Sequence, residues 1–198
     1  DLVRSRGLGD VYKRQVLSGL GAGEIGDARC EPASRIGVLG HSRGGVAAIL
    51  SAERTSVRAV ATWAAIASPR RYAAMFEGVP PGEPVPVRNS RTGEVLPLYR
   101  TVVTDLEAHP ERFDLEASLR RSGVPLLVVH GTDDTSVPPE DARRLAGATG
   151  RARLELIEGA GHTFEVGHPF EGPSPELERA LELTVRHFAA HLEPANGD

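Results

Sequence analysis

The sequence predicts an α/β fold built on a mainly parallel, doubly wound sheet. Residues 35–40 form a short apolar run without polar alternation, as expected for a strand buried on both faces. Similar strand-like runs at 57–62, 124–130 and 153–158 are separated by helix-like segments. This order gives parallel strands joined by right-handed crossovers. A third observation is the abrupt passage from strand to helix around Ser42.

Composition and charge limit the classes of function. The chain has 198 residues, of which 40% are hydrophobic and 25% charged, as in an ordinary soluble globular protein of one domain. The net charge is −4 and no basic run occurs, which argues against a nucleic-acid partner. The longest apolar run, residues 59–67, is too short to span a membrane. A single cysteine, Cys30, excludes an internal disulfide. Localisation stays open, with the cytoplasm favoured, and so does the oligomeric state.

Residues 1–15 do not resemble native protein sequence. Ser5 to Gln15 match, codon for codon, a transposon-end adapter used to prepare sequencing libraries. We therefore predict that this segment is translated adapter, joined to a gene fragment that begins near Val16, and we leave it out of the fold. The alternative is a native polar arm. Finding the same residues in a genomic clone would decide in favour of the arm.

A sharp turn is predicted at residues 40–44, GHSRG. It lies between the first strand and a helix at 44–54 whose first turn consists of small residues. Gly40 and Gly44 are expected to let the helix approach the strand closely, and the turn strains the Ser42 backbone. The serine hydroxyl is then exposed at the carboxyl end of the sheet, where the helix amino terminus favours negative charge.

The other core elements continue the alternation. Residues 16–23 are interpreted as the end of a helix, and 24–34 as a connection into the first strand. A helix is predicted at 138–148, which begins with proline as helices often do. A closing helix is predicted at 176–191, where apolar residues recur at helical spacing.

Residues 67–122 interrupt this alternation. The segment is too long for an ordinary connection, so we predict that it folds over the carboxyl edge of the sheet as a cap. The core of the fold would then consist of residues 16–66 and 123–198. Within the cap the sequence predicts a helix at 69–77, irregular structure in the proline-rich residues 79–86, a hairpin from 85–88 and 94–98, and short helices at 99–108 and 114–121.

A serine hydroxyl becomes a nucleophile when a base takes its proton and an acid orients that base. Candidates for both follow later strands, in the loops GTDDTSVP at 131–138 and GAGHTF at 159–164. Both loops leave the carboxyl ends of parallel strands, where open α/β sheets place their ligands. We therefore expect an aspartate of the first loop and His162 of the second to lie beside Ser42.

The motifs GHSRGG, HGTDDTSVP and GAGHTF resemble those of the α/β-hydrolase superfamily. The long insertion is similar to the caps of its dienelactone-hydrolase-like and feruloyl-esterase-like members, and the resemblance covers residues 16–193. It implies that Ser42 is the nucleophile and His162 the general base. Asp134 is then the orienting acid, since the family places this aspartate three residues before Val-Pro. Asp133 is the near alternative, and otherwise a residue that holds the loop.

The resemblance carries two further implications. The backbone N–H of Arg43 would be one donor of the oxyanion hole, whereas the second donor belongs to a loop after an earlier strand that this sequence lacks. In the family the strand that precedes the nucleophile is the fifth, so we expect four strands to be missing. The fragment is then expected to be inactive and poorly soluble, and the function to belong to its parent.

Several other side chains have two possible roles. Three aromatic residues could line an acyl or aromatic pocket or simply pack in the core or cap: Trp63, Tyr72 and Phe76. Three histidines lie near the candidate site in sequence: His168, a backup base, and His41 and His130, interpreted as packing or loop-anchoring groups. No metal-ligand spacing occurs, so neither a metal nor a cofactor is expected.

The sequence therefore predicts a serine hydrolase that acts on small-molecule carboxylic esters through an acyl-enzyme. True dienelactone hydrolases carry a cysteine nucleophile, so Ser42 moves the interpretation towards ordinary esters. Two alternatives remain open: an aminoacyl-peptidase-like amide hydrolase, and a non-catalytic binding protein of the same fold.

Overall fold

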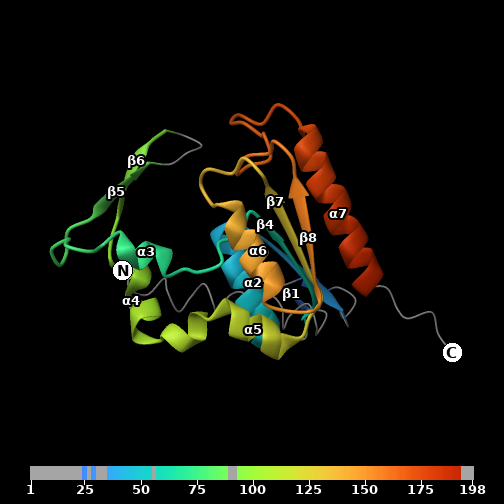
Figure 1. Cartoon of the computed structure of the whole chain (residues 1–198), viewed down its shortest axis with the longest axis horizontal. Helices are drawn as coiled ribbons and strands as arrows, with labels where there is room; N and C mark the ends of the chain where they lie inside the picture. The colour runs from blue at the N-terminus through green and yellow to red at the C-terminus, as the bar shows by residue number, and fades with distance from the viewer. Residues whose placement is uncertain (1–23, 26–27, 30–34, 55–56, 89–92, 193–198) are drawn as a thin grey trace.

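Figure 1 shows the computed structural model of the chain, which describes residues 24–25, 28–29, 35–54, 57–88 and 93–192. The predictions made for residues 1–15 and 16–23 lie outside the described residues. Within the segment predicted as a connection, two-residue strands β1 (Glu24–Ile25) and β2 (Ala28–Arg29) form an antiparallel pair.

The central sheet confirms the predicted α/β architecture. Its four strands are β3 (Ile36–His41), β4 (Val57–Trp63), β7 (Leu126–Gly131) and β8 (Ala152–Ile157). They lie side by side in the order β3-β4-β7-β8, and each neighbouring pair is parallel. Their carboxyl ends therefore meet at one edge, the upper edge in Figure 1.

Helices cover both faces of this sheet (Figure 1). One face carries α2 (Arg43–Arg54), α5 (Leu115–Ser122) and α6 (Pro139–Gly147), and the other carries α7 (Pro175–Leu192). Successive strand residues point to opposite faces. Val60 and Leu126 accordingly pack with α2, α5 and α6, whereas Ala61 and Leu127 pack with α7. Among the described helices, none is long and apolar enough to cross a membrane.

The insertion contains α3 (Arg71–Ala74), strands β5 (Val85–Arg88) and β6 (Val95–Leu98), helix α4 (Thr101–Ala108) and the 3₁₀ helix η1 (Pro110–Phe113). The predicted hairpin is present: β5 and β6 pair antiparallel, with Pro86 opposite Pro97. A pair of edge strands tolerates proline because the missing N–H faces away from the partner.

The helix predicted at 69–77 is shorter than expected. After Ala74 the chain continues in turns, with hydrogen bonds such as Phe76 N–H to Ala73 O and Val79 N–H to Phe76 O. Gly78 then takes a φ of +73°, which ends any right-handed helix. The helix is therefore only four residues long, because Gly78, Pro80 and Pro81 follow closely after it.

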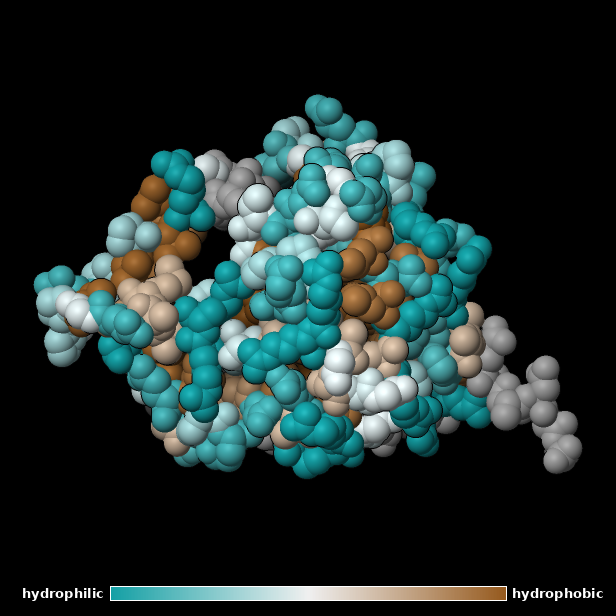
Figure 2. Space-filling model, in the orientation of Figure 1, coloured by the Kyte–Doolittle hydropathy of each residue, from teal (hydrophilic) through white to brown (hydrophobic). Residues whose placement is uncertain are grey.

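The cap has a small apolar core of its own. Phe76, Val103 and Leu106 are buried against one another, apart from the two clusters of the sheet. Figure 1 shows the β5–β6 hairpin beside the sheet, to the left of its carboxyl edge, rather than over that edge. Brown apolar atoms are visible on this hairpin in Figure 2, where Val95 and Leu96 are exposed. Helix α5, in contrast, packs on α2 in the main core.

Candidate active site

Ser42 occupies a strained turn between β3 and α2. Its φ is +54°, a left-handed conformation that a non-glycine residue adopts only when its surroundings impose it. Two backbone hydrogen bonds hold the turn: the Ser42 N–H donates to Trp63 O at 2.8 Å, and the Gly45 N–H donates to Ser42 O at 3.0 Å. The sharp turn expected from the sequence is therefore present.

The glycines of this turn differ in how much room each would leave for a side chain. A Cβ on Gly40 would lie 2.2 Å from Gly44 O, and one on Gly45 would lie 2.4 Å from the Ala65 Cβ. A Cβ on Gly44 would meet nothing within 4 Å. The expected close approach of helix and strand is present, because Gly40 lies against the Gly44 backbone, but a side chain on Gly44 itself would have room. In α2 the crowded position is Gly45, which faces Ala65 just after β4.

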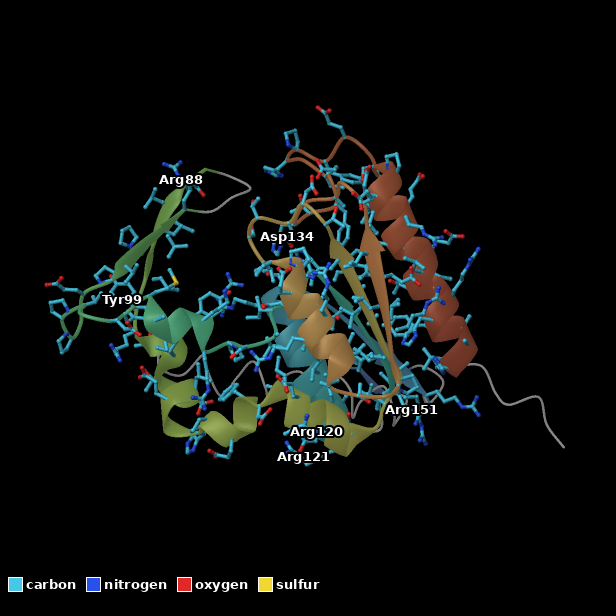
Figure 3. The ribbon with its side chains drawn as sticks, viewed as in Figure 1. Arg88, Tyr99, Arg120, Arg121, Asp134 and Arg151 are labelled. Atoms are coloured by element: carbon cyan, nitrogen blue, oxygen red, sulfur yellow. The ribbon has the colours of Figure 1, made fainter. Side chains whose placement is uncertain are left out.

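Three side chains from three loops form a hydrogen-bonded series. The Ser42 hydroxyl donates to His162 Nε2 at 3.1 Å, and His162 Nδ1–H donates to Asp134 Oδ2 at 2.8 Å. The Asp134 side chain is fully buried and that of His162 is 17% exposed. Figure 3 shows Asp134 in the loop beyond β7, at the carboxyl edge of the sheet. The structure thus brings together the three residues singled out from separate motifs.

The Asp134 carboxylate accepts hydrogen bonds on both oxygens. Oδ1 accepts the backbone N–H groups of Ser136 and Val137, each at 2.8 Å, and Oδ2 faces His162 and His130. Burial by itself would raise the pKa of this carboxyl, but hydrogen bonds from His130, His162 and Val137 outweigh it and hold the pKa well below its usual range. Asp134 is therefore a carboxylate in neutral solution.

Asp133, the alternative acid, is exposed and has a different environment. Its Oδ1 accepts the Thr132 hydroxyl at 3.0 Å, and its N–H donates to Ala160 O at 3.0 Å. It makes no hydrogen bond to His162 among the described residues. This geometry corresponds to the loop-holding interpretation of Asp133.

The loops that carry Asp134 and His162 are fastened to each other. The Thr132 N–H donates to Ile157 O at 3.0 Å, and the Gly159 N–H donates to Thr132 Oγ1 at 2.8 Å. A Cβ on Gly131 would lie 2.0 Å from Ala160 O, so only glycine permits this approach. The separation of the acid and the imidazole is therefore set by backbone contacts between neighbouring strands.

The buried side chain of Phe164 anchors the loop around His162. Phe164 is 1% exposed and meets the Trp63 ring edge-on at 5.5 Å between centroids. Its φ of +53° and the φ of +58° at Glu165 mark a tight turn, and Glu165 Oε1 accepts the Gly161 N–H at 2.7 Å. Burial of the Phe164 ring compensates for the strain of the turn.

Two further histidines, His41 next to Ser42 and His168 after His162, are placed differently. His41 Nε2–H donates to the His162 backbone oxygen at 2.9 Å, and the two rings lie 4.8 Å apart. Burial lowers the pKa of His41, although the hydrogen bond to His162 opposes the shift. His168 is exposed and makes no hydrogen bond to Ser42 or Asp134 within the described chain.

The aromatic candidates lie in two regions. Trp63 Nε1–H donates to Thr184 Oγ1 at 2.9 Å, and Phe76 is buried in the cap cluster. Tyr72 lies under the Arg43 guanidinium, whose carbon is 5.4 Å from the ring centroid. The Arg43 backbone N–H is in the first turn of α2, where helices leave N–H groups without acceptors.

Comparisons with known proteins agree with this architecture. The putative carbamate hydrolase RutD of Pseudomonas savastanoi pv. phaseolicola is 41% identical over 59 residues, which are 30% of this chain and 23% of that protein. The match thus spans less than a quarter of the length of this curated relative.

Solved structures share the fold over most of the chain. The esterase domain of a Rhodothermus marinus protein has a TM-score of 0.64 and 22% identity, covering 92% of this chain and 69% of that one. A monoacylglycerol lipase of Paleococcus ferrophilus has a TM-score of 0.60 and 19% identity, covering 91% and 74%. The model of the alpha/beta hydrolase family matches residues 4–178. The chain therefore belongs to the alpha/beta hydrolase family.

Proposed function

We propose that the whole protein is a serine hydrolase that cleaves carboxylic esters through an acyl-enzyme. The observation that carries this proposal is the hydrogen-bonded series from Ser42 through His162 to Asp134, with distances of 3.1 and 2.8 Å. Such a series is recognised by geometry and by the protonation state of its members. Its acid is buried and ionised, and its base is partly accessible.

In acylation, His162 Nε2 takes the Ser42 proton while Oγ attacks the ester carbonyl carbon. Asp134 stabilises the imidazolium that forms, because its Oδ2 accepts the His162 Nδ1–H. The Arg43 backbone N–H and the amino terminus of α2 face the developing oxyanion. The imidazolium then gives its proton to the departing alcohol, and the serine ester remains. The Ser42 turn presents Oγ without rearrangement of the backbone.

Deacylation repeats these transfers with water. His162 removes a proton from a water molecule, the hydroxide attacks the acyl carbon, and the imidazolium returns a proton to Ser42 Oγ. The products are the carboxylic acid and the free serine. The reaction as proposed uses side chains and backbone of the protein together with water.

Residues 67–122 are proposed to act as the cap that selects the substrate. Tyr72, a side chain of the cap, lies against the guanidinium of Arg43, the residue after Ser42, and we propose that it contacts the substrate. Phe76 is enclosed in the cap cluster and Trp63 packs against Phe164, so these two support the walls of the site. The hydrolase core would consist of residues 16–66 and 123–198, with α5 of the cap segment resting on it.

A second candidate function is hydrolysis of a carbonyl–nitrogen bond. The observation that favours it is the 59-residue match to a protein named as a putative carbamate hydrolase. The same series of side chains serves both reactions, and they differ in whether the leaving group is an alcohol or an amine.

The test uses the whole protein, with any sequence that precedes or follows this chain. Labelling by a fluorophosphonate probe should be lost in Ser42→Ala and retained in Ser122→Ala, whose hydroxyl bonds Leu119 O in α5. Turnover of p-nitrophenyl acetate should exceed that of the matching anilide. Absence of labelling in the wild type would contradict any enzymatic role and favour the binding protein. Faster cleavage of the anilide or a carbamate would favour the second candidate.

A further inference from the structure

His130 is a fully buried histidine that the proposed mechanism does not use. It lies near the end of β7, and its side chain and that of Asp134 are both 0% exposed. Its Nε2 lies 2.9 Å from Val137 O and 3.2 Å from Asp134 Oδ2. That carboxylate oxygen is the one that accepts His162 Nδ1–H. Asp134 therefore stands between two imidazoles.

The surroundings of His130 indicate which ring nitrogen carries the proton. Both groups within reach of Nε2, the Val137 carbonyl and the Asp134 carboxylate, are acceptors. Nδ1 is buried and has no hydrogen-bond partner among the described residues. A proton on Nδ1 would be a buried donor without an acceptor, which is costly. The tautomer with its proton on Nε2 satisfies the site, with that proton shared between the two oxygens.

We propose that His130 is a positioning residue for the Asp134–His162 pair, a role that rests on the proposed serine-hydrolase function. Its Nε2–H fixes the Val137 carbonyl and, through it, the turn whose N–H groups hold Asp134 Oδ1. The same N–H draws on the charge of Oδ2 and so limits how strongly Asp134 stabilises a protonated His162. His130 thereby sets both the orientation of the Asp134 carboxylate and the strength of its electrostatic interaction with His162.

The titratable groups around this arrangement are few. Within the described chain, His130 faces Asp134 from β7 and His162 faces it from the loop after β8. His41, at the end of β3, lies against His162 and adds a neighbouring ring. Burial opposes ionisation of the Asp134 carboxyl, and the two imidazoles help to lower its pKa in spite of it. Loss of the His130 donor therefore changes how strongly the Asp134 carboxylate interacts with His162.

The experiment compares His130→Leu with His130→Gln in the whole protein. Leucine removes the donor, whereas the glutamine amide returns one at about the place of Nε2. His130→Leu should lower kcat/KM for p-nitrophenyl acetate by about tenfold to a hundredfold, as loss of a hydrogen bond to a charged group does. The acidic limb of its pH profile should move to higher pH, because Asp134 then gives more of its charge to His162. His130→Gln should restore most of both properties.

Ser118→Ala is the matched control, because Ser118 is equally buried, its hydroxyl has no partner in the described chain, and it lies in α5. This variant should keep the wild-type rate and pH profile. A folded His130→Leu variant with unchanged kinetics overturns the proposal. Equal losses in His130→Leu and His130→Gln without movement of the acidic limb also overturn it, since they indicate a packing role alone.

A readout independent of turnover separates this proposal from the proposed function. Long-range ¹H–¹⁵N NMR spectra of the wild type should show His130 with its proton on Nε2, and a proton on Nδ1 would overturn the inference. If the wild type is not labelled by fluorophosphonate, the serine-hydrolase proposal itself has failed. His130 then has no base to position, which overturns the inference as well.

Discussion

The loops at the carboxyl edge of the sheet and the cap are held together by different means. The edge loops are fastened by backbone hydrogen bonds, such as Ser42 N–H to Trp63 O at 2.8 Å and Asp133 N–H to Ala160 O at 3.0 Å. The cap instead depends on a small apolar cluster around Phe76. Its polar links to the core include Arg71 to Ser136 O at 3.1 Å and, from α5, Arg121 to Glu53 at 2.6 Å.

The edge loops require precise positions of their side chains, and the cap does not. Proton transfer between Ser42 and His162 tolerates little change in distance, and parallel strands supply fixed backbone on both sides. A cap that selects substrates needs only to enclose a volume, so a separate small cluster is sufficient. The two regions should therefore respond to substitution independently.

The largest effect is expected at the edge, from Asp134→Asn. An asparagine amide cannot accept the His162 Nδ1–H with the charge that the imidazolium requires, and the reverse tautomer is favoured. The turnover number for an ester should fall about ten-thousandfold. Asp133→Asn, one residue away and exposed, should change the turnover number less than about twofold. A large loss in Asp133→Asn instead would reassign the acid.

Removal of the buried ring in Phe76→Ala should open the cap and leave the core closed. A large-to-small change of this kind costs about 3–5 kcal/mol. Hydrogen exchange should accelerate in residues 85–88 and 101–108, while amides of β4 and β7 keep their protection. Met75→Ala, at a half-exposed neighbour, is the control. If the amides of β4 and β7 exchange faster as well, the cap and the core form one cooperative unit and do not respond independently.

Gly131→Ala should disturb the edge without touching the cap. The added Cβ would lie 2.0 Å from Ala160 O, so the loops of β7 and β8 must separate, at a cost of about 1–3 kcal/mol. Fluorophosphonate labelling should slow, because Asp134 and His162 move apart. In Gly147→Ala the added Cβ meets nothing within 4 Å, and the variant should equal or exceed wild-type stability. Equal labelling rates in the two variants would show that loop spacing does not matter.

The smallest effect concerns His187 on α7, which lies in neither region. Burial lowers its pKa from 6.5, and the neighbouring charge of His191 adds to the shift. The unfolded chain then binds the proton more readily than the folded chain, so stability should decline as the pH falls below about 6.5. The unfolding temperature of His187→Leu should decline less over this range of pH. His109 is exposed on the cap, and His109→Leu should show the same decline as the wild type.

Most of the core could be predicted because its signals are local. Strands such as Val57–Trp63 and Leu126–Gly131 are short apolar runs, and the order of strands and helices leaves few topologies. The hairpin of β5 and β6 was also predicted, since a turn-rich loop with a glycine separates two short strand-like runs. In each case the residues that decide the structure lie close together in sequence.

Other features were missed because their causes lie elsewhere in the chain. The crowded glycine is Gly45 and not Gly44, which depends on where Ala65 comes to lie. The contact of His130 with Asp134 follows from the path of the loop after β7. Neither periodicity nor motif spacing carries this information.

Apolar patterning and glycine placement act over a few residues, so the sequence alone is sufficient to predict the parallel sheet, the strained serine turn and the candidate loops. The family resemblance named Asp134 as the acid and kept Asp133 as the alternative; the folded structure places Asp134, and not Asp133, against His162, and it adds a second imidazole behind the carboxylate. The reason is geometric: adjacent residues in a turn point in different directions, and only the packing of β7 against β8 selects which one is buried.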